Sequence, residues 1–133
     1  MRKRILLVED DTLIGLQLED DLTEAGYEVT LATYFKEALA SMTDAPEAFN
    51  MVVCDLNIPM YAETKQNPRP LGLDLLREVR QYQDRYRDTP FILHTGDDSD
   101  ETKKRCAEQN VKYCSKQIDV SSSGLLELLK EHA

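Results

Sequence analysis

Two short apolar segments of the chain run directly into carboxylates that could do chemistry. Residues 52–54 lead into Asp55, and residues 5–8 lead into Glu9 and Asp10. A carboxylate at the end of a buried strand costs free energy unless something there uses it. Crowded carboxylates repel one another unless a cation lies among them, and Mg²⁺ prefers such oxygen ligands. Since a carboxylate can also attack phosphorus, these residue types predict a magnesium-dependent site that forms an aspartyl phosphate.

The elements that must position these side chains alternate between strand and helix patterns. Strands are predicted over residues 4–8, 28–32, 49–56, 91–95 and 112–115. Helical patterns lie at residues 11–25, 33–42, around 75–86, and at 101–109 and 121–131. Five strand–helix units in succession predict one α/β domain over residues 1–133, with a doubly wound parallel sheet between helices.

Apolar spacing predicts the buried faces of two of these helices. The first face consists of Ile14, Leu18, Leu22 and Ala25, in a helix that Asp11 or Thr12 can cap and Gly26 can end. The second consists of Leu75, Val79, Tyr82 and Tyr86. The last two tyrosines are therefore predicted to pack in the core.

Ligands of an open parallel sheet bind beyond the carboxyl ends of its strands. The fourth predicted strand ends in Thr95 and Gly96, and the fifth ends in Ser115 and Lys116. These residues should therefore face the same crevice as the carboxylates, and Gly96 would leave open space beside a phosphoryl group.

Each group in this crevice has a predicted role. Asp10 and Asp55 are expected to bind Mg²⁺ directly, and Glu9 mostly through water. The ammonium group of Lys116 and the hydroxyl group of Thr95 would neutralise the negative charge of the transferred phosphoryl group.

Together and in this order, the residues resemble the receiver domain of two-component response regulators, and the resemblance covers essentially the whole chain. By matching motifs, Asp55 looks like the phospho-acceptor, Glu9 and Asp10 like the acidic pair, and Thr95 and Lys116 like the switch hydroxyl and the lysine.

Further positions strengthen the resemblance. Asn57 would offer its backbone carbonyl to Mg²⁺, Pro59 matches the usual proline of the following loop, and Tyr113 matches the switch aromatic residue. Asn57 and Asp97 occupy positions that tune phosphate loss in this family, and an amide with an acid there resembles receivers that hydrolyse quickly.

The resemblance implies a flavodoxin-like sheet of strand order 2-1-3-4-5. It implies that the phosphoryl donor is the phosphohistidine of a histidine kinase or histidine phosphotransfer protein. Phosphorylation would draw Thr95 toward the phosphate, turn Tyr113 inward and change the face that binds a downstream protein. Such a switch catalyses only its own phosphorylation and dephosphorylation, so the chain is not expected to be an enzyme.

Three features depart from the family pattern. Lys116 is followed by Gln117 where proline is usual, which predicts a strained cis bond. The family's glycine after the acceptor is displaced to Gly72 by an insertion of residues 61–70. The insertion reads either as a tolerated loop or as a lid or recognition loop beside Asp55. Residues 101–109 are almost wholly polar, which predicts a marginal helix and weak dimerisation.

Composition limits the function further. The chain has 16 basic and 25 acidic residues and a formal net charge of −9, so we expect no binding to nucleic acid or to anionic membranes. The apolar run of residues 5–8 is too short for a signal peptide, and a cytoplasmic location is expected. Three cysteines without close spacing suit free, buried thiols.

Other readings remain at this stage. The main one is a pseudo-receiver that keeps the fold as an interaction module without being phosphorylated, motivated by the missing proline and the insertion. A flavin carrier is remote because the loop after the first strand is acidic. An aspartate-nucleophile phosphatase is also remote, because Asn57 stands where such enzymes have a second aspartate. His94 is predicted to point away from the crevice.

Overall fold

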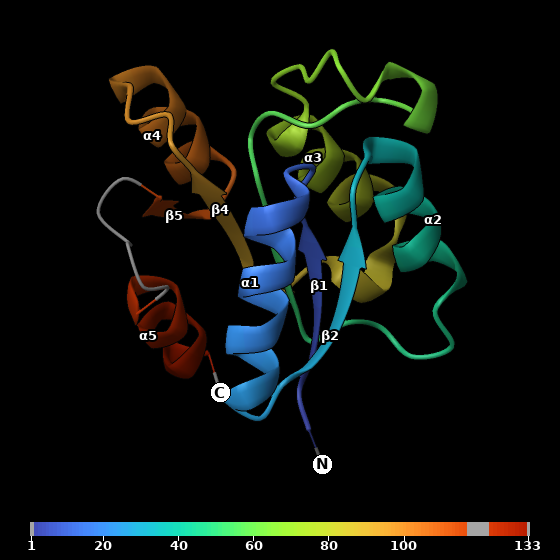
Figure 1. Ribbon diagram of the computed structural model, residues 1–133, viewed down its shortest axis with the longest axis vertical. Helices are drawn as coiled ribbons and strands as arrows, with labels where there is room; N and C mark the ends of the chain where they lie inside the picture. Colours follow the sequence, from blue (N-terminus) through green and yellow to red (C-terminus); the bar gives the residue numbers. More distant parts are fainter. Residues whose placement is uncertain (1, 117–122, 133) are drawn as a thin grey trace.

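The sheet has the predicted parallel arrangement. The computed structural model describes residues 2–116 and 123–132. Its strands are β1 (Arg4–Val8), β2 (Glu28–Ala32), β3 (Met51–Cys54), β4 (Phe91–Thr95) and β5 (Lys112–Ser115). Their order is β2-β1-β3-β4-β5, and every neighbouring pair is parallel (Figure 1). The predicted strand order is confirmed, and β3 is shorter than the sequence pattern indicated.

Helices connect the strands and cover both faces of the sheet (Figure 1). They are α1 (Thr12–Glu24), α2 (Phe35–Asp44), α3 (Gly72–Tyr82), α4 (Asp100–Glu108) and α5 (Ser123–Glu131), with the 3₁₀ helices η1 (Ala62–Thr64) and η2 (Asp84–Tyr86). Among the described residues, none of these helices is both long and apolar enough to cross a bilayer.

Alternation along the strands builds two separate cores. Leu6 and Val8 of β1 pack with residues of α2, α3 and α4, whereas Ile5 and Leu7 pack with residues of α1 and α5. Successive side chains of a strand point to opposite faces, so residues 5–8 of β1 must all be apolar to serve both cores. The free cysteines are buried as predicted.

The caps of α1 agree with prediction, but its buried face is narrower. The Asp11 carboxylate accepts a hydrogen bond from the backbone N–H of Ile14 at 3.1 Å. Gly26 adopts a φ of 102° just after the helix, a conformation that favours glycine. The buried residues of this helix are Gly15, Leu18 and Leu22. Ile14 and Ala25 are exposed, so their predicted burial is wrong.

The predicted burial of Tyr82 is also wrong. Tyr82 is the last residue of α3 and is 73% exposed. Gln83 then takes an extended conformation, which ends the helical repeat, and η2 places Tyr86 in the core. The Tyr86 hydroxyl donates a hydrogen bond to Met42 O at 3.1 Å. The two tyrosines therefore occupy different surroundings because the helix stops between them.

The insertion of residues 61–70 is an exposed loop with a fixed base. Ile58 and Arg69 form an isolated antiparallel bridge with two hydrogen bonds of 2.9 and 3.1 Å. Pro59 O and Met60 O accept hydrogen bonds from the first backbone N–H groups of α2. All residues from 61 to 70 are exposed. The loop therefore begins and ends at a closed base, three residues beyond Asp55.

Candidate functional site

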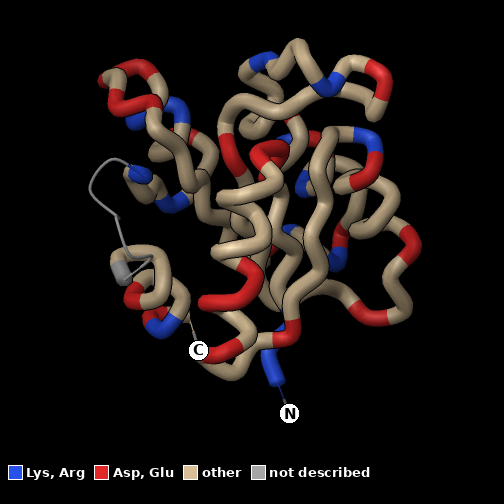
Figure 2. The backbone as a smooth tube through the Cα atoms, viewed as in Figure 1, with Lys and Arg blue, Asp and Glu red and all other residues tan. Residues whose placement is uncertain are grey.

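Three carboxylates meet where β1 and β3 end. Glu9 and Asp10 directly follow β1, and Asp55 directly follows β3. Each of the three can offer one oxygen atom such that all three oxygens lie within 4.8 Å of one another. Figure 2 shows acidic segments meeting at this end of the central strands. The structure thus brings together the predicted acidic residues, which come from two neighbouring parallel strands.

Lys116 connects two of these carboxylates. Its Nζ atom donates hydrogen bonds to Glu9 Oε1 at 2.5 Å and to Asp55 Oδ2 at 2.8 Å. The backbone N–H of Lys116 bonds to Thr95 O at 2.9 Å, which sets the residue beyond the end of β5. Burial lowers the pKa of Lys116, but the charges of Asp55 and Glu9 outweigh this and leave the pKa raised. The lysine therefore stays protonated and fixed over the carboxylates.

Burial and mutual repulsion disfavour the ionised forms of Glu9 and Asp10. Glu9 is 2% exposed, and burial together with the Asp55 charge raises its pKa to about 7 against the opposing effect of Lys116. Burial and the Asp55 charge also raise the pKa of Asp10. A further cation among these groups would relieve the repulsion that remains.

The residues present fit Mg²⁺. Hard oxygen atoms from three carboxylates converge, and Mg²⁺ uses one or two carboxylates together with water molecules. Both oxygens of Glu9 already accept hydrogen bonds, Oε1 from Lys116 and Oε2 from the backbone N–H of Asp11 at 3.2 Å. This leaves Asp10 and Asp55 as the carboxylates best placed to bind a metal directly.

The position of Asp55 is fixed by the backbone around it. Its backbone N–H continues the sheet by bonding to Val8 O at 3.0 Å, and its side chain is 12% exposed. The backbone N–H of Asn57 lies 3.5 Å from Asp55 Oδ1, which makes a long and weak hydrogen bond. The Asn57 side chain is exposed.

Gly72 packs directly on the backbone of Asp55 and Leu56. A Cβ atom on Gly72 would lie 2.1 Å from Asp55 O, a distance that no real contact permits. The backbone N–H of Gly72 also bonds to Leu56 O at 2.8 Å. The insertion therefore lengthens the loop without removing the glycine that lets α3 approach Asp55.

The predicted switch hydroxyl lies at the same edge of the sheet. Thr95 is the last residue of β4 and is buried, and its Oγ1 accepts a hydrogen bond from the backbone N–H of Asp97 at 3.2 Å. A Cβ on Gly96 would meet nothing within 4 Å, as expected of open space. The Asp97 carboxylate accepts hydrogen bonds from Ser99 and Thr102, so it is engaged with α4.

Tyr113 is half-buried and bonded to the loop after β4. Its hydroxyl donates a hydrogen bond to Asp97 O at 2.9 Å, and Lys103 Nζ lies 5.5 Å from the centre of its ring. His94 is buried within β4. The predicted cis bond between Lys116 and Gln117 lies outside the described residues.

Sequence reasoning did not single out Arg80 or Thr102. Arg80 lies on α3 four residues after Leu76, so a charged residue on the apolar face was the available signal. Thr102 stands three residues after Ser99, the spacing of an N-cap and its partner. Of the predicted polar helix, only Thr102 and Cys106 are buried, and Ala107 is exposed.

Comparisons with known proteins agree with this geometry. A family model described as response regulator receiver domain matches residues 5–127. Transcriptional regulatory protein QseB of Haemophilus influenzae is 36% identical over 96 residues, which are 72% of this chain and 37% of that protein. The CAI-1 autoinducer sensor kinase/phosphatase CqsS of Vibrio cholerae is 30% identical over 100 residues, which are 75% of this chain and 13% of that protein. The chain thus spans well under half the length of both curated relatives.

Solved structures show the same fold. The chemotaxis response regulator CheY4 of Vibrio cholerae superposes with a TM-score of 0.80 at 25% identity, covering 100% of both chains. The response regulator protein TrrA of Thermotoga maritima, solved in complex with Mg(2+)-BeF, superposes with a TM-score of 0.76 at 25% identity. That match covers 98% of this chain and 99% of the other.

Proposed function

Because the chain belongs to the response regulator receiver domain family, we propose that it is a signalling switch that accepts a phosphoryl group on Asp55. The observation that carries this proposal is the paired contact of Lys116 with Asp55 and Glu9, beside a third carboxylate. A structural ion pair needs only one carboxylate, whereas phosphoryl transfer needs a nucleophile, a fixed cation and a place for a metal.

The residues of this chain have distinct roles in the transfer. An oxygen of Asp55 attacks phosphorus, and the bond from phosphorus to the donor nitrogen of a phosphohistidine breaks as the imidazole leaves with that electron pair. Lys116 holds Asp55 in position and neutralises charge on the transferred group, and the Thr95 hydroxyl donates a hydrogen bond to it. Hydrolysis of the acyl phosphate returns the Asp55 carboxylate and inorganic phosphate.

Magnesium would be held by Asp10 and Asp55, with the Asn57 backbone carbonyl and, through water, Glu9. When bound, it supplies Lewis-acid neutralisation of the phosphoryl oxygens. The Mg(2+)-BeF complex of the similar TrrA protein supports this proposal for the present chain.

A histidine kinase or a histidine phosphotransfer protein would supply the phosphoryl group. The similarity to part of a sensor kinase/phosphatase and to a transcriptional regulatory protein supports a place in such a pathway. A downstream protein would then read the surface that includes Tyr113 and α4.

The test is the intact mass of the protein after incubation with a small acyl-phosphate donor. We expect one added phosphoryl group in the wild type with Mg²⁺, and none when a chelator replaces the metal. Asp55→Asn should gain no adduct, and Asp98→Asn, a change at an exposed neighbouring acid, should behave like the wild type. A folded wild type that takes up no phosphoryl group would favour the pseudo-receiver reading instead.

A further inference from the structure

The insertion returns to the residues that follow Asp55 and bonds to them. Ile58 and Arg69 exchange two backbone hydrogen bonds, of 2.9 and 3.1 Å, a pairing called here the base of the insertion. The backbone N–H of Gly72 then donates to Leu56 O at 2.8 Å. Ile58 is 0% exposed, whereas the side chain of Arg69 lies at the surface. The insertion therefore holds the segment after Asp55 through backbone atoms.

The same segment is bonded on its other side to the start of α2, next to which the insertion lies (Figure 1). The first N–H groups of a helix have no partner inside the helix, and the N-cap residue Tyr34 makes no side-chain cap hydrogen bond. Instead, the backbone N–H of Phe35 donates to Pro59 O at 2.8 Å. The backbone N–H of Lys36 donates to Met60 O at 3.1 Å. Two carbonyls after Asp55 thus cap α2, and α2 in turn fixes them.

Asn57 lies between these fixed points and differs from its neighbours. The carbonyls of residues 56, 58, 59 and 60 each accept a backbone hydrogen bond. No donor in residues 2–116 and 123–132 bonds to Asn57 O. The Asn57 N–H lies 3.5 Å from Asp55 Oδ1, so this residue stands directly beside the carboxylate. The bonds around Asn57 therefore fix its backbone and leave its carbonyl oxygen to bind a metal.

We propose that Arg69 is a positioning residue for Mg²⁺, and that the base of the insertion holds the Asn57 carbonyl where the metal needs it. The proposal rests on the function proposed above, which assigns that carbonyl to Mg²⁺. Mg²⁺ demands near-ideal octahedral geometry, so a carbonyl that is already fixed binds it without a further loss of backbone entropy. Only the backbone of Arg69 takes part. The exposed residues 61–67 then serve as a connection and need not cover Asp55.

Metal binding by the full chain, measured by titration calorimetry without a phosphoryl donor, tests the proposal. Arg69→Pro removes the N–H that donates to Ile58 O. Its Mg²⁺ dissociation constant should rise about tenfold, as expected when the backbone of one residue must be ordered on binding. Arg69→Ala is the matched control, because it removes the guanidinium group and keeps the N–H, and it should bind Mg²⁺ like the wild type. Replacement of residues 62–66 by two glycines should also leave the affinity unchanged.

A second metal separates positioning from a general loss of structure. Ca²⁺ accepts oxygen ligands in a flexible geometry, so Arg69→Pro should raise the Ca²⁺ dissociation constant only about twofold. Equal losses of affinity for Mg²⁺ and Ca²⁺ would overturn the positioning role. An Mg²⁺ affinity that falls as far in Arg69→Ala as in Arg69→Pro would overturn it too, since the backbone N–H would then not be the cause. A tenfold loss on replacing residues 62–66 would show instead that the exposed residues matter.

Amide hydrogen exchange of the metal-free chain tests the base without any ligand. In Arg69→Pro, exchange at the Ile58 N–H should become about fivefold to tenfold faster, because one of the two bonds of the base is lost. Exchange at the distant Val111 should stay at the wild-type rate. Unchanged exchange at Ile58, or a wild-type Mg²⁺ affinity in Arg69→Pro, would overturn the proposal and leave the proposed function standing. A wild type that binds no Mg²⁺ would instead contradict the proposed function, and with it the metal-positioning role of the base.

Discussion

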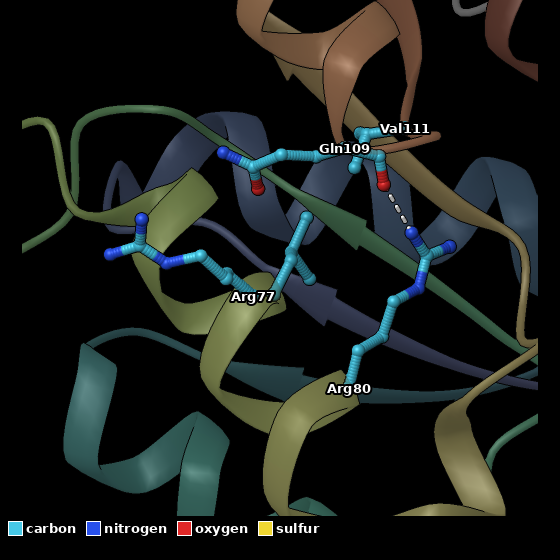
Figure 3. Close-up of a pocket in the computed structure, with 5 residues that line it drawn as sticks. Arg77, Arg80, Gln109 and Val111 are labelled. Atoms are coloured by element: carbon cyan, nitrogen blue, oxygen red, sulfur yellow. Dashed lines mark hydrogen bonds between the residues drawn. The ribbon is translucent and has the colours of Figure 1, made fainter.

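Two partly buried basic side chains lie at opposite ends of the strands of the sheet, called here its carboxyl edge and its amino edge, and they differ in their partners. At the carboxyl edge, Lys116 bonds to the carboxylates of Asp55 and Glu9. At the amino edge, Arg80 bonds to three backbone carbonyl oxygens, among them Gln109 O (Figure 3). Backbone carbonyls neither titrate nor attack phosphorus, so Arg80 fixes geometry. Carboxylates do both, so under the proposed function Lys116 takes part in phosphoryl transfer. The partner, more than the charge itself, decides which of these two partly buried cations belongs to the candidate site.

The largest expected effect concerns the carboxyl edge. Lys116→Ala should slow phosphoryl uptake from a small acyl-phosphate donor about 1,000-fold, because a fixed charge aimed at the transferred group is lost. The rate is measured by intact mass against time. Lys112→Ala, a change at an exposed residue of β5, is the control and should keep the wild-type rate. Uptake at an undiminished rate in Lys116→Ala would remove the distinction between the two cations.

Gly72→Ala should destabilise the fold by about 3 kcal/mol, near the upper end of what overpacking costs. The new Cβ would lie 2.1 Å from Asp55 O, so either α3 or the segment that contains Asp55 must move. Urea unfolding measures the free energy. Gly96→Ala, whose Cβ would meet nothing within 4 Å, provides the comparison and should cost far less. Equal losses in both variants would show that the close approach at Gly72 is unimportant.

The amino edge should respond in stability but not in chemistry. Arg80→Ala should lower the free energy of unfolding by about 2 kcal/mol, since three carbonyl oxygens lose a charged donor. Its rate of phosphoryl uptake should stay at the wild-type value. Arg77→Ala removes an exposed arginine of the same helix and should cost less than about 0.5 kcal/mol. A loss of uptake in Arg80→Ala would contradict the separation of the two edges.

The smallest effect is the stabilisation by metal alone. With no phosphoryl donor present, Mg²⁺ at about ten times its dissociation constant should add about 1.4 kcal/mol to the free energy of unfolding. Arg80→Ala should keep this increment, because Arg80 lies away from the carboxylates. Asp10→Asn should lose it. Denaturant unfolding with and without Mg²⁺ provides the measurement, and an equal increment in Asp10→Asn would place the metal elsewhere.

The sequence was most informative where one pattern decides the structure. Alternating strand and helix patterns predicted the five parallel strands, and polar residues at strand ends predicted which carboxylates meet at Asp55. The pattern failed at Tyr82, because continuing a helical repeat does not show where the helix stops. It also missed Arg80, since a charged residue on a helix gives no sign that its partners are backbone carbonyls from distant segments. Contacts of that kind depend on tertiary packing.

The most direct test of the central claim is to locate the phosphoryl group among three neighbouring carboxylates. After phosphorylation with Mg²⁺, borohydride reduces an acyl phosphate to an alcohol, and peptide mass spectrometry then identifies the converted residue. Conversion of Asp55 alone, absent in Asp55→Asn, is the expected result. Conversion of Glu9 or Asp10 in the wild type, or a phosphoryl adduct that persists in Asp55→Asn, would contradict the assignment of Asp55 as the acceptor.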